Sequence, residues 1–482
     1  MKNHKRKTDK YQVQVELTTA APQQTQYAGL LAVQRVWERL DVAALLETAQ
    51  ICYAGSVTAA AEMSFMLAVQ PWVAADSQRK VAQRFGGEPS PDNIEQDPFS
   101  TYLLAGSYSQ RTLNRFVNTS RYDWQAFNYA RVLRLHDHPD FVPHRQGVLI
   151  LDDFPLPKPY AREMAYLSPI WDNNLKRTVK GYSVVHLYYY HPRRPSYSVS
   201  VMPWLKTSAT GATRRKSGRR PAQPDEEHSR LDLALLTLKT WWPIFDTCKA
   251  VLFDCWYSAR WLCWQFTQLG IPWIGEAKTS QKFRVHSRFL SVNYIYELYR
   301  HKLQHVKVRG LSKQVRAVAI PAVLEPDPYT RRRQPVLLVL VEGLTKKRDN
   351  DKGYKLLVTP QRHWSIQRIL RLFSYRFKIE PTHRDGKQDA GWNDFHTRTL
   401  AALHCHLNIA LLRSTLLTLL SKWIPTWATY STREMIAHGI GLLALLIYDP
   451  HQQCLVLQMF PSPLALGLRP TARAPCDSSF AC

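Results

Sequence analysis

The feature that most constrains this chain is a short apolar run that ends in two adjacent carboxylates. Residues 148–151 read Val-Leu-Ile-Leu, and Asp152 and Asp153 follow directly. A continuous run of branched and aliphatic side chains of this length predicts a buried β-strand. A buried strand needs neighbouring strands and covering helices, so we expect a sheet in which this strand ends in acidic side chains.

Strand and helix patterns alternate after this point. We expect strands at residues 182–190, 197–205, 250–254 and 272–278, and helices at residues 231–242 and 260–269. This mixed α/β order fits one central sheet. Between the second Asp and the later helical region, residues 283–360 are mostly β, with strands expected at 314–322, 335–341 and 354–358. They predict a β-rich insertion.

The patterns divide the chain into six segments. These are a flexible basic arm (1–26), a helical domain (27–146), the first part of an α/β core (147–282), the β-rich insertion (283–360), a helical second part of the core (361–462) and a tail (463–482). Residues 206–230 carry Arg and Lys among Ser, Gly and Pro, which predicts a mobile basic loop.

The charge balance predicts a polyanionic partner. The chain has 64 Lys and Arg against 38 Asp and Glu, which gives a net charge of +26. The positive residues are spread along the chain among aromatic residues, and no basic amphipathic helix stands out, so nucleic acid is favoured over a membrane surface. A merely basic enzyme remains the alternative. The eight cysteines show no CxxC pair, and the N-terminus lacks a secretory signal, so we expect a soluble protein of a reducing cytosol.

Residues 108–116 predict a capped, basic helix, with Ser109 as the cap. A helix of this kind can lie in a DNA groove, but it can equally serve as scaffold in a helical domain. The sequence leaves both interpretations open.

Three acidic positions far apart in the sequence have contexts that suit one shared site. Asp153 closes the first core strand, Asp254 closes the strand at 250–254, and Glu380 lies on a helix after the insertion. Carboxylates from adjacent strand ends and a flanking helix form an oxygen-rich pocket that suits Mg²⁺ or Mn²⁺. Two such ions, about 4 Å apart, support phosphoryl displacement. Each acid alone is more typical of a turn or a helix cap, so the third position carries the argument.

The third acid belongs to the pattern R-x3-E-x6-K. Arg376 and Glu380 are one helical turn apart, and Lys387 falls two further turns along the same side. One helix face would then present an acid between two cations. The alternative is a solvated, salt-bridged helix face without catalytic function.

Together these motifs resemble the Tyr-Arg-Glu-Lys signature of bacterial insertion-sequence transposases of the DDE type, the group of the transposon-five and transposon-ten enzymes. The motif Leu151-Asp152-Asp153 and the run Leu-Phe-Asp-Cys-Trp-Tyr at 252–257 are similar to the contexts of that family's first and second acids. The resemblance covers about residues 147–420. It implies an RNase H-like mixed-sheet catalytic core with a β-rich insertion, preceded by a helical DNA-binding domain.

The resemblance makes Asp153, Asp254 and Glu380 the catalytic residues and the ligands of two Mg²⁺ or Mn²⁺ ions. Neighbouring residues on a strand face opposite ways, so only one of Asp152 and Asp153 should reach the metals. We prefer Asp153, because the acid of this family usually closes the strand, and keep Asp152 as the alternate.

Five further residues become candidates for DNA contacts. The resemblance assigns Arg376 and Lys387 to DNA-end phosphates. The tyrosine of the signature is Phe373 in this chain, and Tyr375, two residues on, is its possible substitute. Tyr354 or Trp364 could stack on a flipped base, with core packing as the alternative for either.

The function implied by the resemblance is cut-and-paste transposition. The partners would be double-stranded DNA, at the element ends and the target, and a second copy of the chain in a homodimeric DNA complex, in the bacterial cytoplasm at the nucleoid. One alternative is another RNase H-fold nuclease, such as a junction resolvase, which needs neither the Arg-Glu-Lys helix nor the insertion. Another is a non-catalytic DNA-binding protein derived from a transposase, and the presence of all three acids argues against it.

Overall fold

A computed structural model defines the structure of the chain. It describes residues 23–25, 30–73, 108–119, 121–164, 166–172, 176–205, 228–308, 315–326, 331–344, 353–395, 397–424, 428–429, 431–436, 444–449 and 454–459. Most of the predicted basic loop, the predicted tail and residues 1–22 of the predicted arm lie outside these ranges.

The helices are α1 (Leu30–Leu40), α2 (Val42–Thr48), α3 (Val57–Val69), α6 (Gln110–Val117), α7 (Trp124–His136), α8 (Arg230–Phe245), α9 (Arg260–Gln268), α10 (Val292–Tyr299), α11 (Ile366–Ser374), α12 (Ile379–Gln388), α13 (Leu400–Trp423) and α14 (Thr432–Glu434). Short 3₁₀ turns are η1 (Gln70–Val73), η3 (Cys255–Tyr257), η4 (Arg300–Lys302) and η5 (Tyr375–Lys378).

The strands are β1 (Gln23–Thr25), β2 (Val148–Pro157), β3 (Ser168–Asp172), β4 (Arg177–Tyr190), β5 (Tyr197–Trp204), β6 (Val251–Phe253), β7 (Trp273–Glu276), β8 (Lys282–Val285), β9 (Arg288–Ser291), β10 (Gln304–Val306), β11 (Val315–Leu324), β12 (Gln334–Glu342), β13 (Tyr354–Thr359), β14 (Ala444–Asp449) and β15 (Cys454–Met459). Strand β3 and helix α10 are elements that the sequence did not predict.

The part of the sheet around β2 has a mixed order, β5-β4-β2-β6-β7. Strand β4 runs antiparallel to both β2 and β5, whereas β6 runs parallel to β2 and to β7. Helix α8 leads from β5 to β6, and α9 leads from β6 to β7. Three antiparallel strands followed by two parallel crossovers form an RNase H-like core, which confirms the predicted fold.

The β-rich insertion continues this sheet instead of forming one of its own. Strand β13 pairs antiparallel with β7, with Val358 opposite Gly275, and β12 and β11 follow in order. The combined sheet has 12 strands among the described residues, from β3 at one edge to β9 at the other. The insertion is therefore attached to the core by backbone hydrogen bonds along a strand.

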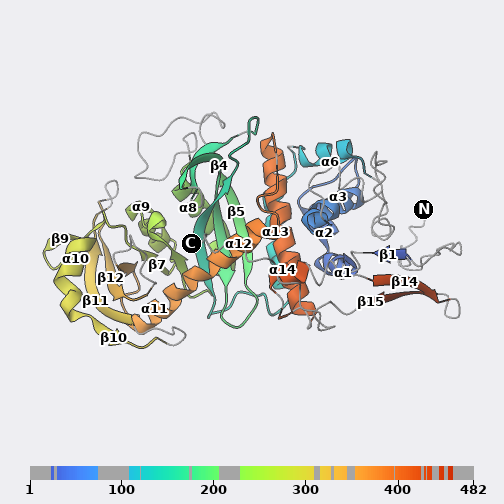
Figure 1. Ribbon diagram of the computed structural model, residues 1–482. Coiled ribbons are helices and arrows are strands. Elements are labelled where there is room, and N and C mark those ends of the chain that lie inside the picture. The colour runs from blue at the N-terminus through green and yellow to red at the C-terminus, as the bar shows by residue number, and fades with distance from the viewer. Residues whose placement is uncertain are drawn as a thin grey trace, which may run out of the picture.

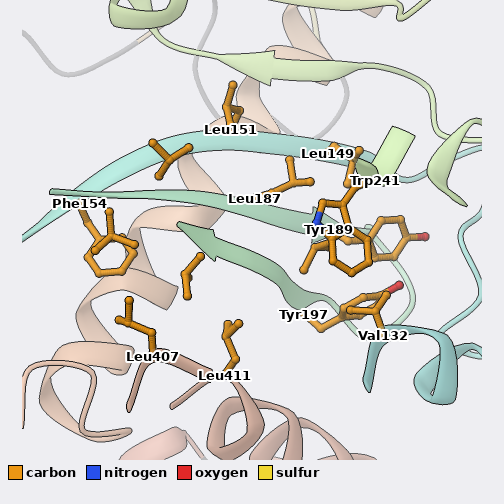
Figure 2. Packing of buried hydrophobic residues seen from close by; sticks show 14 of the residues in the cluster. Val132, Leu149, Leu151, Phe154, Leu187, Tyr189, Tyr197, Trp241, Leu407 and Leu411 are labelled. Carbon is orange, nitrogen blue, oxygen red and sulfur yellow. The ribbon is translucent and has the colours of Figure 1, made fainter. Parts of the chain in front are cut away.

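Helices cover both faces of the part of the sheet around β2. On one face, Leu149 and Leu151 of β2 share a buried cluster with residues of α8 and α13. Figure 2 shows Leu407 and Leu411 of α13 on the same side of the strands as Val132 of α7. On the other face, Val148 and Ile150 share a second cluster with α11. Alternate residues of β2 thus face different helices, as the pleat of a strand requires.

Helix α13 lies between the sheet and the N-terminal helices (Figure 1). It is the one described helix that is long and apolar enough to cross a membrane, but 72% of its most apolar stretch is buried inside the protein. It contacts β5 of the sheet and also α1, α3 and α7. Its apolar character is accounted for by this double packing, since a helix that is hydrophobic all round belongs in a core.

Two buried arginines fasten the helical N-terminal part to the core. Arg413 of α13 donates to the carbonyls of Leu67 and Ala68 at the end of α3, at 2.9 and 3.0 Å, and also to the carbonyl of Ala390. Arg131 of α7 donates to the hydroxyl of Thr415 at 2.6 Å and to carbonyls of β5. The guanidinium groups thus satisfy carbonyls at helix and strand ends that would otherwise be buried without partners.

The C-terminal region contradicts the predicted helical part. The sequence predicts helical turns to about residue 447, within a helical segment that extends to residue 462, but residues 444–449 and 454–459 form the hairpin β14–β15, and β14 pairs with β1. Residues 23–25 of the predicted flexible arm are therefore strand. The reason is that an apolar run of this length, here Ala-Leu-Leu-Ile-Tyr-Asp, has the length of a strand and does not by periodicity distinguish strand from helix.

Candidate active site

Strand β2 carries the first acidic pair near the middle of the sheet. Asp152 lies opposite His186 of β4, on the face covered by α11 and α12. The pleat turns the next residue, Asp153, to the face covered by α8. The two carboxylates therefore belong to different surroundings, although they are neighbours in the sequence.

Asp254 follows directly after β6, which is parallel to β2 and adjacent to it. Its Oδ1 accepts a hydrogen bond of 2.9 Å from the backbone N–H of Trp256, so the carboxylate caps the short turn η3. Strand β6 ends opposite Leu151 of β2, and this places Asp254 beside the acidic pair. The pair lies within β2 and does not close it as the sequence predicted, because the strand continues to Pro157.

Glu380 and Arg376 are positioned by a break in the helix that the sequence predicted as continuous. Arg376 lies in the 3₁₀ turn η5, and Glu380 lies in the first turn of α12. Pro381 has no backbone N–H to donate, so it is tolerated in a first helical turn but not further in. A carboxylate in a first turn is also favoured by the helix dipole.

Three carboxylates converge on the guanidinium of Arg376. Its Nη2 lies 3.3 Å from Oδ2 of Asp152 and 3.8 Å from Oδ2 of Asp254, and its Nη1 lies 3.5 Å from Oε1 of Glu380. The side chains of Asp152 and Arg376 are only 11% and 13% exposed, whereas that of Glu380 is 58% exposed. The cluster is thus closed on the side of the sheet and open on the side of α12.

Burial and charge both act on these groups. Burial raises the pKa of Asp152 to about 7, while the positive charge of Arg376 opposes this shift. Burial also raises the pKa of Asp254, again with Arg376 acting in the opposite direction. Burial lowers the pKa of Arg376, but the carboxylates of Asp152, Asp254 and Glu380 outweigh it, so the net shift is upward. The arginine is the counter-ion of the acidic cluster.

Asp153, which we preferred as the first acid, is not part of this cluster. Its Oδ2 pairs with Nη1 of Arg230 at 2.5 Å and accepts a hydrogen bond of 3.2 Å from Ser183, while its Oδ1 accepts one of 3.4 Å from the hydroxyl of Tyr257. The structure brings together Asp152, Asp254 and Glu380. The physical reason is the alternation of the strand, because Asp152 has the parity that faces α12.

The other residues of the Arg-Glu-Lys region lie near the cluster without joining it. The Nζ of Lys387 lies 5.8 Å from the ring centre of Phe154, two residues beyond Asp152 on the same strand, and burial lowers its pKa. Gly386 allows Trp392 to pack closely, because a Cβ at that position would approach the indole to 2.6 Å. The ring of Tyr375 packs on Tyr190 with their centres 5.0 Å apart.

The two candidates for base stacking are already in contact with other groups. Tyr354 stacks on Tyr296 with the ring centres 3.8 Å apart and the planes at 3°, and its hydroxyl donates to Asn293. Trp364 is buried at 6% exposure in the cluster that includes α11. Arg368 lies over its ring, with Cζ 4.1 Å from the ring centre. Core packing, the alternative considered for both, describes Trp364.

The donor set of the cluster has the chemistry of a divalent-cation site. Within the described ranges, no three His, Cys, Asp or Glu side chains lie close enough to share one metal ion. The guanidinium of Arg376 instead contacts all three carboxylates. Carboxylate oxygens are the hard ligands that Mg²⁺ and Mn²⁺ prefer, and acids gathered this closely require a positive charge between them. The residues therefore fit such an ion, with Arg376 supplying one positive charge in its place.

Sequence reasoning missed the group of residues around Asp153. These are Arg230 at the start of α8, Trp256 in η3, and Lys278 just after β7. No local pattern marks Arg230 or Lys278, whereas Trp256 belongs to the run at 252–257 that marked the second acid, although no role was assigned to it. One signal in the sequence could have indicated this group. Side chains alternate between the two faces of a strand, so one of the two carboxylates of β2 had to face away from Glu380.

Family comparisons agree with this architecture. A family model described as DDE superfamily endonuclease matches residues 98–319, which include Asp152 and Asp254. A second, described as Transposase DDE domain, matches residues 234–416, which include Asp254 and Glu380. No curated protein matches the chain. The chain is thus similar to DDE endonucleases and transposases from residue 98 to residue 416, and these matches support a transposase-type nuclease of the DDE class.

Proposed function

We propose that this protein is a DNA transposase that cuts and rejoins the ends of a bacterial insertion sequence, with Asp152, Asp254 and Glu380 as its catalytic acids. The observation that carries the proposal is the convergence of these three carboxylates on Arg376, from the middle of β2, the end of β6 and the first turn of α12. A solvated helix face would leave Arg376 and Glu380 in water, whereas the Arg376 side chain is largely buried.

The three acids would hold two Mg²⁺ or Mn²⁺ ions. Bound there, the ions would help to deprotonate the attacking oxygen and stabilise the leaving oxygen. Asp152 and Asp254 supply rigid ligands because strand and turn fix their backbones, and Glu380 supplies one from the open side of the site. Arg376 would then be released from part of its contact with the acids, and its guanidinium would be free to hold a DNA phosphate next to the reacting bond.

The reaction is a series of phosphoryl displacements at this one site. Water attacks the phosphodiester at the element end, which breaks the P–O3′ bond and leaves a 3′-hydroxyl and a 5′-phosphate. In cut-and-paste transposition the 3′-hydroxyl then attacks the opposite strand to give a hairpin. A second water opens the hairpin and frees the 3′-hydroxyl again, and this hydroxyl finally attacks a phosphodiester of the target DNA. Each step exchanges one P–O bond for another, so a single set of acids can serve them all.

DNA contacts are proposed for both sides of the cluster. Lys387 and Tyr375 lie along the face of Asp152 and would hold backbone phosphates together with Arg376. Tyr354 is the remaining candidate for base stacking, if the ring of Tyr296 gives way to a base. In the helical N-terminal part, α6 buries Leu113 and Phe116 and leaves its basic side chains outward, so it can serve both as scaffold and as a DNA-contacting helix. We expect a homodimer in the DNA complex, because two element ends must be cut together.

The test uses the full-length protein, Mg²⁺ and a duplex that carries the ends flanking its own gene. We expect strand cleavage on denaturing gels for the unaltered protein. Glu380→Gln should bind the duplex with unchanged affinity and lose cleavage, because it keeps the size of the side chain but removes a metal-binding charge. Glu163→Gln, which removes an exposed acid paired with Arg398, is the matched control and should cleave normally. Near-normal cleavage by Glu380→Gln would remove Glu380 from the active site and contradict the proposal.

A further inference from the structure

An exposed tryptophan next to the second acid lies between two cations. The side chain of Trp256 is 45% exposed. Cζ of Arg230 lies 4.4 Å from the centre of its ring, and Nζ of Lys278 lies 5.0 Å from it. An aromatic face attracts both guanidinium and ammonium groups, and the ring of Trp256 lies close to one group of each kind.

The position of Arg230 is fixed from its other side by Asp153. The carboxylate is 17% exposed and the guanidinium 26% exposed, and they pair at 2.5 Å. Arg230 also lies near a second indole, with Cζ 5.9 Å from the ring centre of Trp204. Such a buried carboxylate pairs with one of the donor faces of a guanidinium and leaves the remaining donors for another oxygen anion.

Among the described residues, one of the two cations is paired with a carboxylate. Asp153 neutralises one of the two cations, and no carboxylate of the described chain pairs with Lys278. By contrast, the neighbouring Lys355 is paired with Glu276 at 2.8 Å. A lysine that no described carboxylate pairs with, and a partly exposed arginine, both beside an exposed aromatic ring, form a site that attracts a negative group.

Trp256 joins this cationic site to the catalytic cluster. Its backbone N–H donates to Asp254 at 2.9 Å, and its ring holds Arg230 and Lys278. An anion bound by the two cations would therefore lie directly beside the second catalytic acid. A DNA strand carries phosphates at regular intervals, so one phosphate can be bound at the cationic site while a neighbouring phosphate reacts at the acidic cluster.

We propose that Arg230 and Lys278 form a binding site for a DNA backbone phosphate next to the one at which the strand is cut. Trp256 aligns the two cations, and Asp153 holds Arg230 in place. The inference rests on the proposed function in taking DNA as the ligand. It gives Asp153 a positioning role in place of the metal-binding role that the sequence suggested.

The experiment measures binding separately from cleavage. A fluorescent duplex of about 30 base pairs and arbitrary sequence is titrated with the full chain, without divalent metal, at several salt concentrations. Lys278→Gln should lower the affinity and reduce the slope of log K against log salt by about 0.9, the value for one phosphate contact. Lys302→Gln removes a lysine that lies 5.3 Å from the ring of Tyr299 in the insertion, and it is the matched control. A slope for Lys278→Gln equal to that of Lys302→Gln would overturn the proposal.

Two further variants test the alignment. Arg230→Gln alone would leave Asp153 buried without its partner, so the double variant Asp153→Asn with Arg230→Gln replaces the ion pair by two neutral groups and should also lose about 0.9 of slope. Trp256→Ala should weaken binding about threefold to tenfold, and Trp256→Phe should restore most of it, because a phenyl ring also attracts cations. Unchanged DNA affinity of Trp256→Ala would contradict the proposal that Trp256 aligns the two cations. These outcomes are independent of cleavage, so failure of the catalytic proposal would be recognised separately.

Discussion

The two faces of strand β2 gather opposite charges within one residue of each other. On the face of α12, Asp152, Asp254 and Glu380 surround a single arginine. On the face of α8, Asp153 is a single acid beside Arg230, and Lys278 lies nearby across the ring of Trp256. The first face has an excess of oxygen ligands and the second has an excess of cations.

The difference shows that the role of an acidic residue in this fold depends on which helix covers it. Asp152 and Asp153 have the same chemistry and almost the same backbone position. Asp152 shares its face with the helix that brings Glu380, and Asp153 shares its face with the helix that begins at Arg230. The first face suits metal-dependent chemistry, and the second suits holding phosphate.

The largest effect is expected from exchanging each carboxylate for its amide. Asp152→Asn should lower strand cleavage on the order of 10³-fold or more, because a metal ligand contributes several kcal/mol to the transition state. Asp153→Asn should lower it by about tenfold, as expected for a residue that positions a DNA contact. Cleavage rates at saturating Mg²⁺ would be compared with those of Asp137→Asn, which alters an exposed acid paired with Arg134. A larger loss for Asp153→Asn than for Asp152→Asn would reverse the assignment of the two faces.

A second difference between the two faces of β2 concerns the stability of the fold at acidic pH, because a buried histidine pair lies beside Asp152. His186 and His383 lie 2.9 Å apart, and burial lowers the pKa of His186 to about 3. Between pH 6.5 and the folded-state pKa, the unfolded chain takes up a proton that the folded chain does not. The free energy of unfolding should therefore fall by about 1.4 kcal/mol per pH unit for this histidine as the pH drops below about 6.5.

Denaturant unfolding measured across this pH range would check the effect. His186→Asn should show a smaller loss of stability on acidification than the unaltered protein. His301→Asn, which changes an exposed histidine of the insertion, should retain the full loss. If His186→Asn and the unaltered protein lost stability in parallel, the neutral histidine behind the acidic cluster would not be the cause.

The smallest expected effect is at the edge of the acidic face. Tyr375→Phe removes only a hydroxyl, and loss of one hydrogen bond to a phosphate should weaken DNA binding by about fivefold. Tyr190→Phe, on the ring that Tyr375 packs against, is the control for changes in packing. Equal affinities for the two variants would restrict the DNA contacts on this face to Arg376 and Lys387.

The order of the elements was predictable because it depends on local patterns. The expected strands at 182–190, 197–205 and 354–358 correspond closely to β4, β5 and β13, and the expected helix at 231–242 corresponds to α8. Apolar runs bounded by polar turns carry this information within a few residues. The hairpin β14–β15 was not predictable in this way, because its Leu-rich runs do not by periodicity distinguish strand from helix, and β1, from the other end of the chain, pairs with β14.

The sequence by itself determined that an acidic pair adjoins one buried apolar run, that a second acid follows another such run, and that a third acid follows the insertion with an arginine four residues before it. These facts depend on the spacing of residues along single elements. Only the tertiary structure decided that Asp152, and not Asp153, joins Asp254 and Glu380. Strand alternation divides the two carboxylates between opposite faces but does not say which helix covers which face. That depends on α8 and α12, which pack on β2 from positions far along the chain.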